Sequence, residues 1–354
     1  MLILNTTVVL VITFAVLVIA HEFGHYLAAK LVGIRVEEFA LGFGPRLIRV
    51  FRRGDTDYTI HPAPLGGFVK LSGMEPGEGE DDPHGYNAQP VWKRFIVIFA
   101  GPFMSFVLAY VVFCSLGATV GLPVPGVSRN VVGEVQRGTA AERAGLQPGD
   151  RIVAVDEAPV RTGDDIRKIV FISAGKKLSL RVERSGRALT VAATPEQGVV
   201  AGKKVGLLGV LLEPPRARYG IGGSIVQGTR MTAALLRSIF EALSSKEGLK
   251  GVGGIVAITR YTAEGVKHGP DQIVFNLAAL SLSLAIINLV PWPILDGGHL
   301  VLLWLELIRR KKLTVKQMQV FQTVGLATLV ALVLLLVYVD LVRWVPLNRP
   351  LAPP

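Results

Sequence analysis

The chain of 354 residues is 50% hydrophobic and only 18% charged, which is too apolar for an ordinary soluble protein and indicates a membrane protein. The net charge of +11 does not indicate a nucleic-acid partner, because much of the Lys and Arg flanks apolar segments; membrane lipids with anionic headgroups are the expected partner. The single cysteine, Cys114, excludes an intrachain disulfide and a thiolate zinc site.

Four apolar stretches are long enough to span a bilayer as helices, which takes roughly 20 residues. They cover about residues 2–20, 95–118, 273–295 and 320–341. The first has no cationic segment before it and no small-residue cleavage site after it, so we expect a retained helix and not a removable signal peptide.

Positive charge predicts the orientation of these spans. Basic residues follow the first span and precede the fourth: Lys30, Arg35, Arg46, Arg49, Arg52, Arg53, Arg309, Arg310, Lys311, Lys312 and Lys316. Both loops should therefore be cytoplasmic. Both termini and the long segment at about 120–270 should then be extracytoplasmic.

An H-E-x-x-H string, His21 to His25, stands at the end of the first predicted span. Two histidines four residues apart share one face of a helix, so both imidazoles can reach one metal ion, and Glu22 between them can act on water at that metal. Ionisable residues beside lipid are costly and usually functional, which favours a metal site over a chance match.

Residues 55–72 alternate β-prone residues with Pro and Gly turn signals and predict a short hairpin. The segment is too apolar for a simple surface loop, so we expect it to re-enter the membrane. Non-helical backbone is tolerated there only where protein or a water-filled cavity satisfies its polar groups. A cavity is therefore expected beside this hairpin.

The middle of the chain has the character of a soluble domain, with short alternating strands and several Gly turns up to about residue 212. Residues 221–243 then place apolar residues at helical spacings with polar residues between them. This pattern predicts a helix that lies either in the membrane interface or on the soluble domain.

Catalytic zinc normally has three protein ligands and an open position for water, so a third ligand is needed. Asp296 is the best candidate, because it is an acid at the end of the third apolar stretch, after prolines that break the helix. The predicted topology brings His21, His25 and Asp296 to the same cytoplasmic depth. His299 is the competing ligand, but it follows two glycines and is more simply a supporting residue.

These motifs together resemble the site-2 protease family of intramembrane zinc metalloproteases, and their order is similar to the regulator-of-sigma-E protease branch. The matching strings are HEFGH at 21–25, GFGP at 42–45, PLGGFVKLSG at 64–73, PVWKRFIVIFAGPFMSF at 90–106 and NLVPWPILDGG at 288–298. The resemblance implies a location in the bacterial inner membrane, with the active site near the cytoplasmic leaflet.

The resemblance also implies roles for individual residues. His21, His25 and Asp296 would bind Zn²⁺, with Glu22 as the general base. Substrate contacts would come from the following residues: Asn288, Pro291, Pro293, Gly66, Gly67 and Phe68. The hairpin would hold substrate by strand pairing, since a helical substrate must be extended before water can attack its carbonyl.

Residues 126–213 resemble a circularly permuted PDZ domain, with AGLQPGDRI at 144–152 as the most recognisable string. A PDZ groove would accept peptide termini. The best-known members of the branch carry two such domains, whereas this chain has room for one. The expected fold is an α-helical polytopic membrane protein, with membrane cores at 1–125 and 271–354, the inserted PDZ-like domain, and a linker with an amphipathic helix at 214–270.

The expected function is hydrolysis of peptide bonds within transmembrane segments of single-pass membrane proteins, with anti-sigma factors and remnant signal peptides as the substrates that the resemblance suggests. A zinc-stabilised scaffold that recruits partners through its PDZ domain without proteolysis is the alternative. Glu22 disfavours it, because a structural site needs no base and usually has four ligands. A transporter would need more ionisable residues across the spans.

Overall fold

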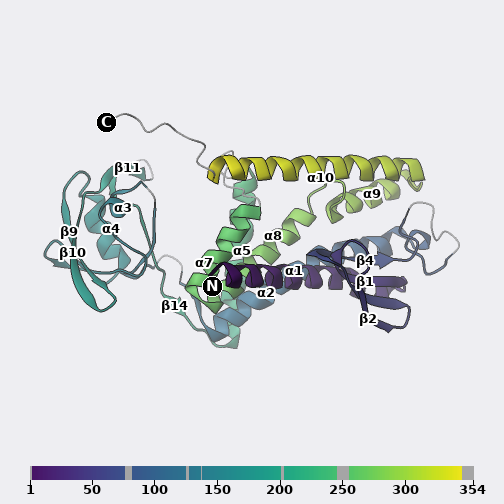
Figure 1. Ribbon diagram of the computed structural model, residues 1–354, viewed down its shortest axis with the longest axis horizontal. Coiled ribbons are helices and arrows are strands. Elements are labelled where there is room, and N and C mark those ends of the chain that lie inside the picture. Colours follow the sequence, from purple (N-terminus) through teal and green to yellow (C-terminus); the bar gives the residue numbers. More distant parts are fainter. Residues whose placement is uncertain are drawn as a thin grey trace. The chain divides into compact units, whose positions relative to one another are not determined.

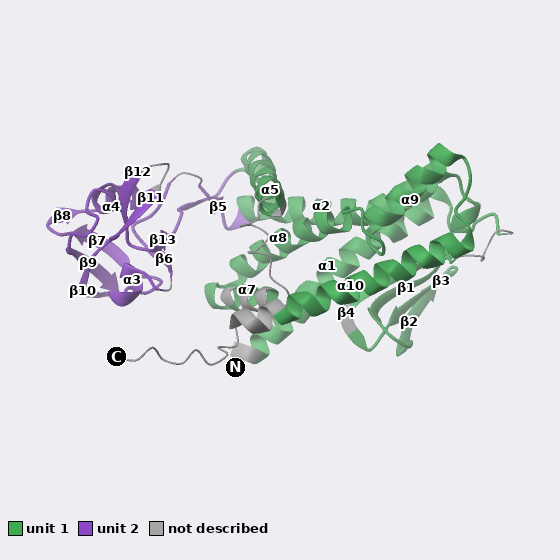
Figure 2. Cartoon of the chain, turned by 90° about the horizontal axis from the view of Figure 1, so that it is seen from above, with its two compact units in different colours: residues 1–118, 220–354 green, residues 119–219 purple. Residues whose placement is uncertain are grey.

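The computed structural model describes residues 2–75, 82–124, 127–136, 138–200, 203–244 and 255–344. The chain forms two compact units, which Figure 2 distinguishes by colour. The first comprises Met1–Ala118 together with Gly220–Pro354, and the second comprises Thr119–Tyr219. Each unit has its own core and is described by itself.

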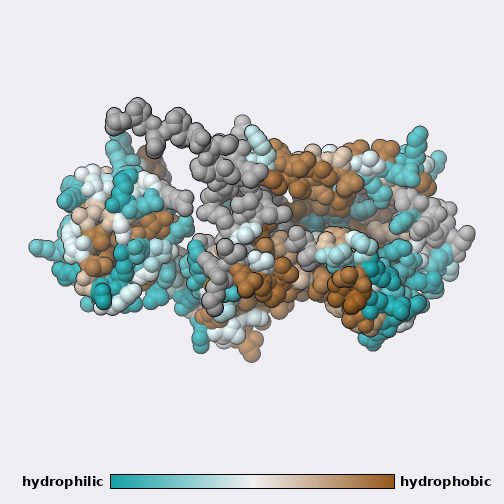
Figure 3. Space-filling model, in the orientation of Figure 1, coloured by the Kyte–Doolittle hydropathy of each residue, from teal (hydrophilic) through white to brown (hydrophobic). Residues whose placement is uncertain are grey.

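Four helices of the first unit are long and apolar enough to cross a membrane, within the described part of the chain. They are α1 (Leu2–Val32), α2 (Val91–Thr119), α8 (Pro270–Asn288) and α10 (Val315–Trp344). Hydrophobic side chains gather over the exposed surface of α10, as expected for a helix in contact with lipid (Figure 3). The four predicted spans are confirmed, and the protein is a multi-pass membrane protein.

Two of the spans differ from the prediction at their ends. Helix α1 continues to Val32, so the H-E-x-x-H string lies inside the helix and not at its end. Helix α8 stops at Asn288, earlier than the predicted residue 295. Pro291 and Pro293 follow, and neither has an N–H to continue the ladder of a helix. The chain turns and begins α9 (Asp296–Arg309).

The region between α1 and α2 contains a four-stranded sheet, so the predicted hairpin at 55–72 is wrong. Its strands are β1 (Val36–Phe43), β2 (Ile48–Arg53), β3 (Thr56–Ile60) and β4 (Ala63–Leu71), in the order β2-β3-β1-β4. Strands β3 and β4 do not pair with each other, because β1 lies between them, parallel to β3 and antiparallel to β4. Strand β4 therefore forms one edge of the sheet. After it come the short helix η1 (Tyr86–Ala88) and then α2.

The sheet lies beside α1 (Figure 1), and aromatic side chains join the two. Tyr26 of α1 lies edge-on to Phe39 of β1, with ring centroids 5.7 Å apart, and its hydroxyl accepts a hydrogen bond of 2.8 Å from Tyr58 of β3. Burial and the bond to Tyr26 raise the pKa of Tyr58 to about 12, so its phenol stays protonated and keeps donating. The sheet is thus fixed beside the helix that carries the H-E-x-x-H string.

Among its described residues, the first unit also contains the helices α5 (Ile221–Ser244) and α7 (Ile255–His268). The helix predicted at 221–243 is confirmed, and it packs against α2, where Tyr110 lies 3.2 Å from Thr229. Its location at the membrane interface stays a prediction. Helix α7 falls in the predicted linker and was not foreseen. It packs on α8, where the amide of Asn276 donates to the Tyr261 carbonyl at 3.1 Å.

The described residues of the second unit form short strands and two helices. A four-stranded sheet has the order β10-β9-β7-β8, and three strand pairs, β11·β12, β6·β13 and β5·β14, complete the strands. The bounds are β5 Leu122–Pro123, β6 Val132–Val135, β7 Arg151–Val155, β8 Ala158–Pro159, β9 Leu178–Arg184, β10 Arg187–Ala193, β11 Glu196–Val200, β12 Lys203–Leu207, β13 Val210–Leu212 and β14 Arg216–Ala217.

The helices of the second unit are α3 (Ala140–Arg143) and α4 (Gly163–Phe171). Thr162 and Asp165 form a reciprocal capping box that fixes the start of α4. Ile166 of that helix is buried with Ile152 and Leu180 of the sheet in one apolar core. This core explains why the sequence of the second unit has the pattern of a soluble domain inside a membrane protein.

Candidate metal centre

His21 and His25 project from one face of α1, four residues and about one turn apart. Both are buried, and their Nε2 atoms lie 3.3 Å from each other. Two imidazole nitrogens that point at one another across so short a distance can share a cation between them. The helix alone therefore supplies two of the three ligands that the sequence predicts.

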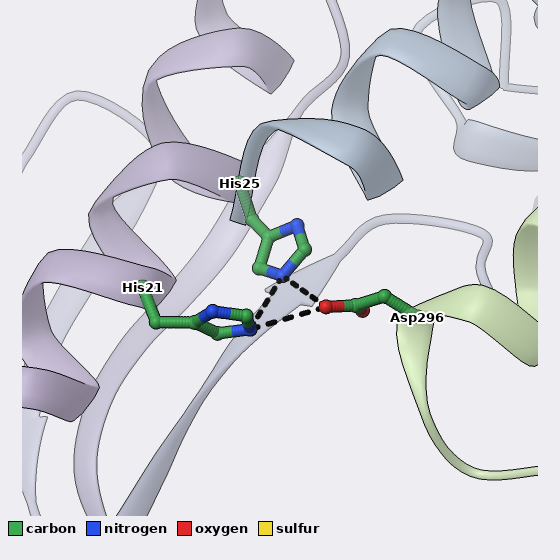
Figure 4. Close-up of side chains that lie close together, drawn as sticks. All are labelled: His21, His25 and Asp296. Carbon is green, nitrogen blue, oxygen red and sulfur yellow. Dashed lines mark hydrogen bonds and ion pairs between the residues drawn. The ribbon is translucent and has the colours of Figure 1, made fainter. Parts of the chain in front are cut away.

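Asp296 reaches the same point from the first residue of α9 (Figure 4). Its Oδ2 atom lies 3.1 Å from Nε2 of His21 and 3.5 Å from Nε2 of His25. The side chain is only 16% exposed, and Oδ2 has no well-directed hydrogen bond within the described part of the chain. The three atoms form a triangle within 4.8 Å, so one small cation could bind all of them.

The far side of each histidine ring is held by α2. Nδ1 of His25 donates to the Val97 carbonyl at 2.8 Å, and Nδ1 of His21 lies 3.1 Å from the Ser105 hydroxyl. Ser281 of α8 in turn donates to the Ser105 carbonyl at 2.8 Å. With Nδ1 engaged in this way, each Nε2 lone pair is directed at the shared point, as in metal sites whose histidines are oriented by outer partners.

The donor set fits zinc. Two imidazole nitrogens and one carboxylate oxygen are typical ligands of catalytic zinc, which keeps a fourth position open. A bound cation would also explain why Oδ2 of Asp296 is buried without a hydrogen-bond donor. Burying such an oxygen is costly unless a cation interacts with it. By geometry and chemistry, His21, His25 and Asp296 are thus a candidate zinc site.

Glu22 lines the same cavity as the three ligands. The backbone of Val69 in β4 hydrogen-bonds to its carboxylate, so the strand and the helix fix this side chain together. Gly67 makes that approach possible, because a β-carbon there would collide with the Ala40 carbonyl and with Val18 of α1. An acid is therefore held next to the metal ligands without itself belonging to the triangle.

The cavity around these groups measures about 390 Å³. Several of the predicted substrate-contact residues line it: Asn288, Gly66, Gly67 and Phe68. The Asn288 amide lies 3.3 Å from Nε2 of His21. Pro291 and Pro293 are not among the lining residues; Pro293 packs instead against Gly325 of α10. His299 lines the cavity but stands outside the ligand triangle, and its ring packs edge-on against Phe321.

Three supporting features were missed by sequence reasoning. The role of Ser105 could have been suspected from the sequence, since a hydroxyl inside an apolar span needs a partner. The role of the Val97 carbonyl could not, because every residue has a backbone carbonyl. Gly101 is the third: a β-carbon there would overlap the imidazole of His25. A glycine inside a span is common, and only the fold shows which of them faces a ligand.

The fold and the site together define a multi-pass membrane protein with a buried metal centre of the zinc-metalloprotease kind. The model of Peptidase family M50 matches residues 9–332. A protein of Clostridium perfringens named "Putative zinc metalloprotease" is 34% identical over 336 residues, covering 94% of this chain and 97% of its own length. The chain therefore belongs to peptidase family M50, a family of zinc metalloproteases.

Other relatives of the same name are similar over a comparable length. One from Mesorhizobium japonicum is 32% identical over 368 residues, covering 96% of this chain and 98% of its own length. One from Clostridium acetobutylicum is 30% identical over 348 residues, covering 96% of this chain and 98% of its own length. The likeness thus includes the second unit as well as the membrane-spanning helices.

Proposed function

We propose that this protein cleaves peptide bonds within the transmembrane segments of single-pass membrane proteins. One observation carries the proposal: a single cavity brings together the zinc ligands, Glu22 and the edge strand β4. A metal site alone would suit a scaffold, and an edge strand alone would suit a binding module. Their combination in one cavity is what peptide hydrolysis requires.

Zinc bound at the triangle would polarise the substrate carbonyl and make water a stronger nucleophile near neutral pH. Glu22 is the proposed general base: it takes the proton of the attacking water and then delivers it to the leaving amine. Because Glu22 lines the same cavity as the three candidate ligands, its carboxylate would be within reach of that water. The Asn288 amide is proposed to donate a hydrogen bond to the substrate carbonyl oxygen as negative charge develops there.

Strand β4 is proposed to hold the substrate in extended form. It forms an edge of its sheet, so its outer N–H and C=O groups have no strand neighbour among the described strands. A transmembrane helix hides each carbonyl in an i to i−4 hydrogen bond, and pairing with an edge strand replaces those bonds while exposing the carbonyl. Gly66, Gly67 and Phe68 lie in the part of β4 that lines the cavity.

The second unit is proposed to be a PDZ-like domain that binds peptide termini. A groove of about 290 Å³ runs along α4 and the residues between β12 and β13. Ile166, Val170 and Leu208 give it an apolar lining. Backbone N–H groups of the short connection between β12 and β13, at Leu208 and Gly209, would suit a terminal carboxylate, since such backbone nests capture anions.

The proposed location is the inner membrane of a bacterium, with the metal centre near the cytoplasmic leaflet and both termini and the PDZ-like unit outside. The support is the excess of Lys and Arg after α1 and after α9. The order of motifs, similar to the regulator-of-sigma-E protease branch, supports the same arrangement. Anti-sigma factors and remnant signal peptides are the proposed substrates.

The test is cleavage of a model single-pass helix by purified protein in detergent, with the products located by mass spectrometry. The parent and Glu22→Gln are compared at equal zinc content. The proposal expects both to bind about one zinc, as three protein ligands dictate, and only the parent to cleave, within the helix. Zinc binding by both without any cleavage of helical substrates by the parent would favour the zinc-stabilised scaffold instead.

A further inference from the structure

A buried ion pair joins the two helices that complete the metal centre from opposite sides. Arg94 of α2 and Glu306 of α9 are 212 residues apart in sequence, and their side chains form two parallel hydrogen bonds of 2.9 and 2.5 Å. The side chains are only 6% and 12% exposed. A bidentate guanidinium–carboxylate pair is among the strongest and most directional of polar contacts.

Further contacts fix Arg94 in place. Its Nε donates to the Gln89 carbonyl at 3.0 Å, and its guanidinium lies 5.9 Å from the centre of the Tyr86 ring. All three guanidinium nitrogens of Arg94 therefore donate a hydrogen bond, one to the segment before α2 and two to Glu306. Because Arg94 is held in one place, it allows one position of the Glu306 carboxylate. That position sets the rotation of α9 and its shift along its own axis.

The two helices contribute different halves of the site. Helix α2 orients both histidines through Val97 and Ser105, whereas α9 begins with Asp296. Glu306 follows Asp296 by ten residues on the same helix, about 15 Å along its axis. A rigid helix transmits a shift at Glu306 to its first residue.

Few other described contacts fix α9 near that end. An exposed one lies just beyond the helix, where Lys312 donates to the Asn87 carbonyl at 2.9 Å. Leu303 is buried in the core shared with α1 and α2, but an apolar contact tolerates small sliding and rotation. At the other end, Gly297 and Gly298 lie tightly against the backbone carbonyls of the preceding loop, so the start of α9 moves together with that loop. The ion pair is the directional contact between α9 and α2 in the described part of the chain.

We propose that Arg94 and Glu306 are positioning residues for the metal centre. The pair sets the register of α9 against α2, and so places the Asp296 carboxylate at ligand distance from His21 and His25. Neither residue belongs to the triangle of candidate ligands. The inference goes beyond the proposed protease function, because it concerns metal binding and would hold for a scaffold as well.

The test measures metal affinity and metal geometry, not activity. Glu306→Gln and Glu306→Asp are purified, depleted of metal and titrated with zinc against a chromophoric chelator, and the visible spectrum of the cobalt(II) form reports the ligand geometry. Glu306→Gln should bind zinc about ten- to a hundredfold more weakly, as when outer partners of a zinc site are removed. Glu306→Asp keeps the charge and should fall between it and the parent.

Glu241→Gln is the matched control, because Glu241 forms an exposed pair with Arg237 on α5 and is expected to change neither readout. Zinc affinity and a cobalt spectrum equal to the parent's in folded Glu306→Gln would overturn the proposal, even if its melting temperature fell. Should that variant not fold, Arg94→Lys, which keeps the buried positive charge but loses the fork, gives the same readouts. Unchanged values there would overturn the proposal equally.

Discussion

Gly101 of α2 lies directly against His25: a β-carbon at Gly101 would overlap the Nε2 and Cε1 atoms of the imidazole. The same crossing is tight from the other side, where a β-carbon on Gly24 would overlap the Ala100 carbonyl. Helices α1 and α2 therefore meet at two glycines, and this close approach lets α2 hold the metal ligands of α1. The spacing of the metal centre thus depends on two positions that have no side chain.

Gly101→Ala should therefore damage the zinc site although every ligand remains. Overpacking costs about 1–3 kcal/mol, and if the displaced imidazole carries that cost, zinc affinity falls about five- to 150-fold. Zinc titration of metal-depleted protein measures it. Gly222→Ala on α5 is the control, because nothing lies within 4 Å of the added carbon. Equal affinities in the two variants would refute the packing argument.

Ser105→Ala should weaken zinc binding by loosening the ring of His21. The hydroxyl that contacts Nδ1 of His21 is lost, and outer partners of zinc-bound histidines are typically worth about ten- to a hundredfold in affinity. Ser283→Ala on α8 is the control, since that hydroxyl donates to the Ala279 carbonyl of its own helix and, among the described residues, to no other group. The same titration compares the two, and an unaffected Ser105→Ala would mean that packing alone orients His21.

Gly67→Ala should reduce cleavage more than metal binding. A methyl group there collides with Ala40 and Val18 and pushes β4 away from α1, which breaks the contact between the Val69 backbone and Glu22. His21, His25 and Asp296 do not depend on that strand. Cleavage rate and zinc content, measured on one preparation, separate these effects. Parallel loss of both would show that β4 supports the whole site and not Glu22 alone.

Asp150 should make the second unit sensitive to acid. It is fully buried; burial would raise its pKa, but hydrogen bonds from Arg184 and from the Gln147 amide hold the pKa below its ordinary value. The pair's contribution to stability is therefore complete above the unfolded pKa of about 3.9, and is lost as the pH falls through the lower folded value.

Arg184→Gln should change this pH dependence as well as the stability. The variant leaves a buried carboxylate short of donors and should lose about 2–4 kcal/mol at pH 7. Burial then dominates and raises the pKa of Asp150, so acidification from pH 6 to 4 should stabilise the variant relative to the parent. Hydrogen exchange of the β9 amides, corrected for the intrinsic rate at each pH, measures both. A difference that is constant with pH would contradict the assignment to Asp150.

The membrane-spanning helices and the ligand triangle could be predicted because their signals are local or chemically rare. Long apolar runs of this length are typical of membrane spans, and an H-E-x-x-H string beside lipid strongly favours a metal site. The position of Asp296 beside the two histidines could be predicted because zinc needs a third ligand and the expected topology brings one acid to the right depth. These inferences required no knowledge of how side chains pack.

The sheet and the supporting contacts could not be predicted in the same way. Strand pairing is non-local, and nothing in residues 55–72 says that β1 separates β3 from β4. The arginines of β2 were interpreted only as a signal of orientation, although they lie on a strand. The pairing of Arg94 with Glu306 depends on the fold alone. The sequence predicts which groups do the chemistry, and the structure shows which contacts hold those groups in place.

The most direct test of the account is a zinc titration of the metal-depleted parent protein while cleavage of a membrane-embedded model helix is followed. The account predicts no cleavage without zinc and a rise to a plateau at about one zinc per chain, as expected for one site with three protein ligands. Cleavage that is independent of zinc, or a fully loaded site that cleaves no helix, would contradict it.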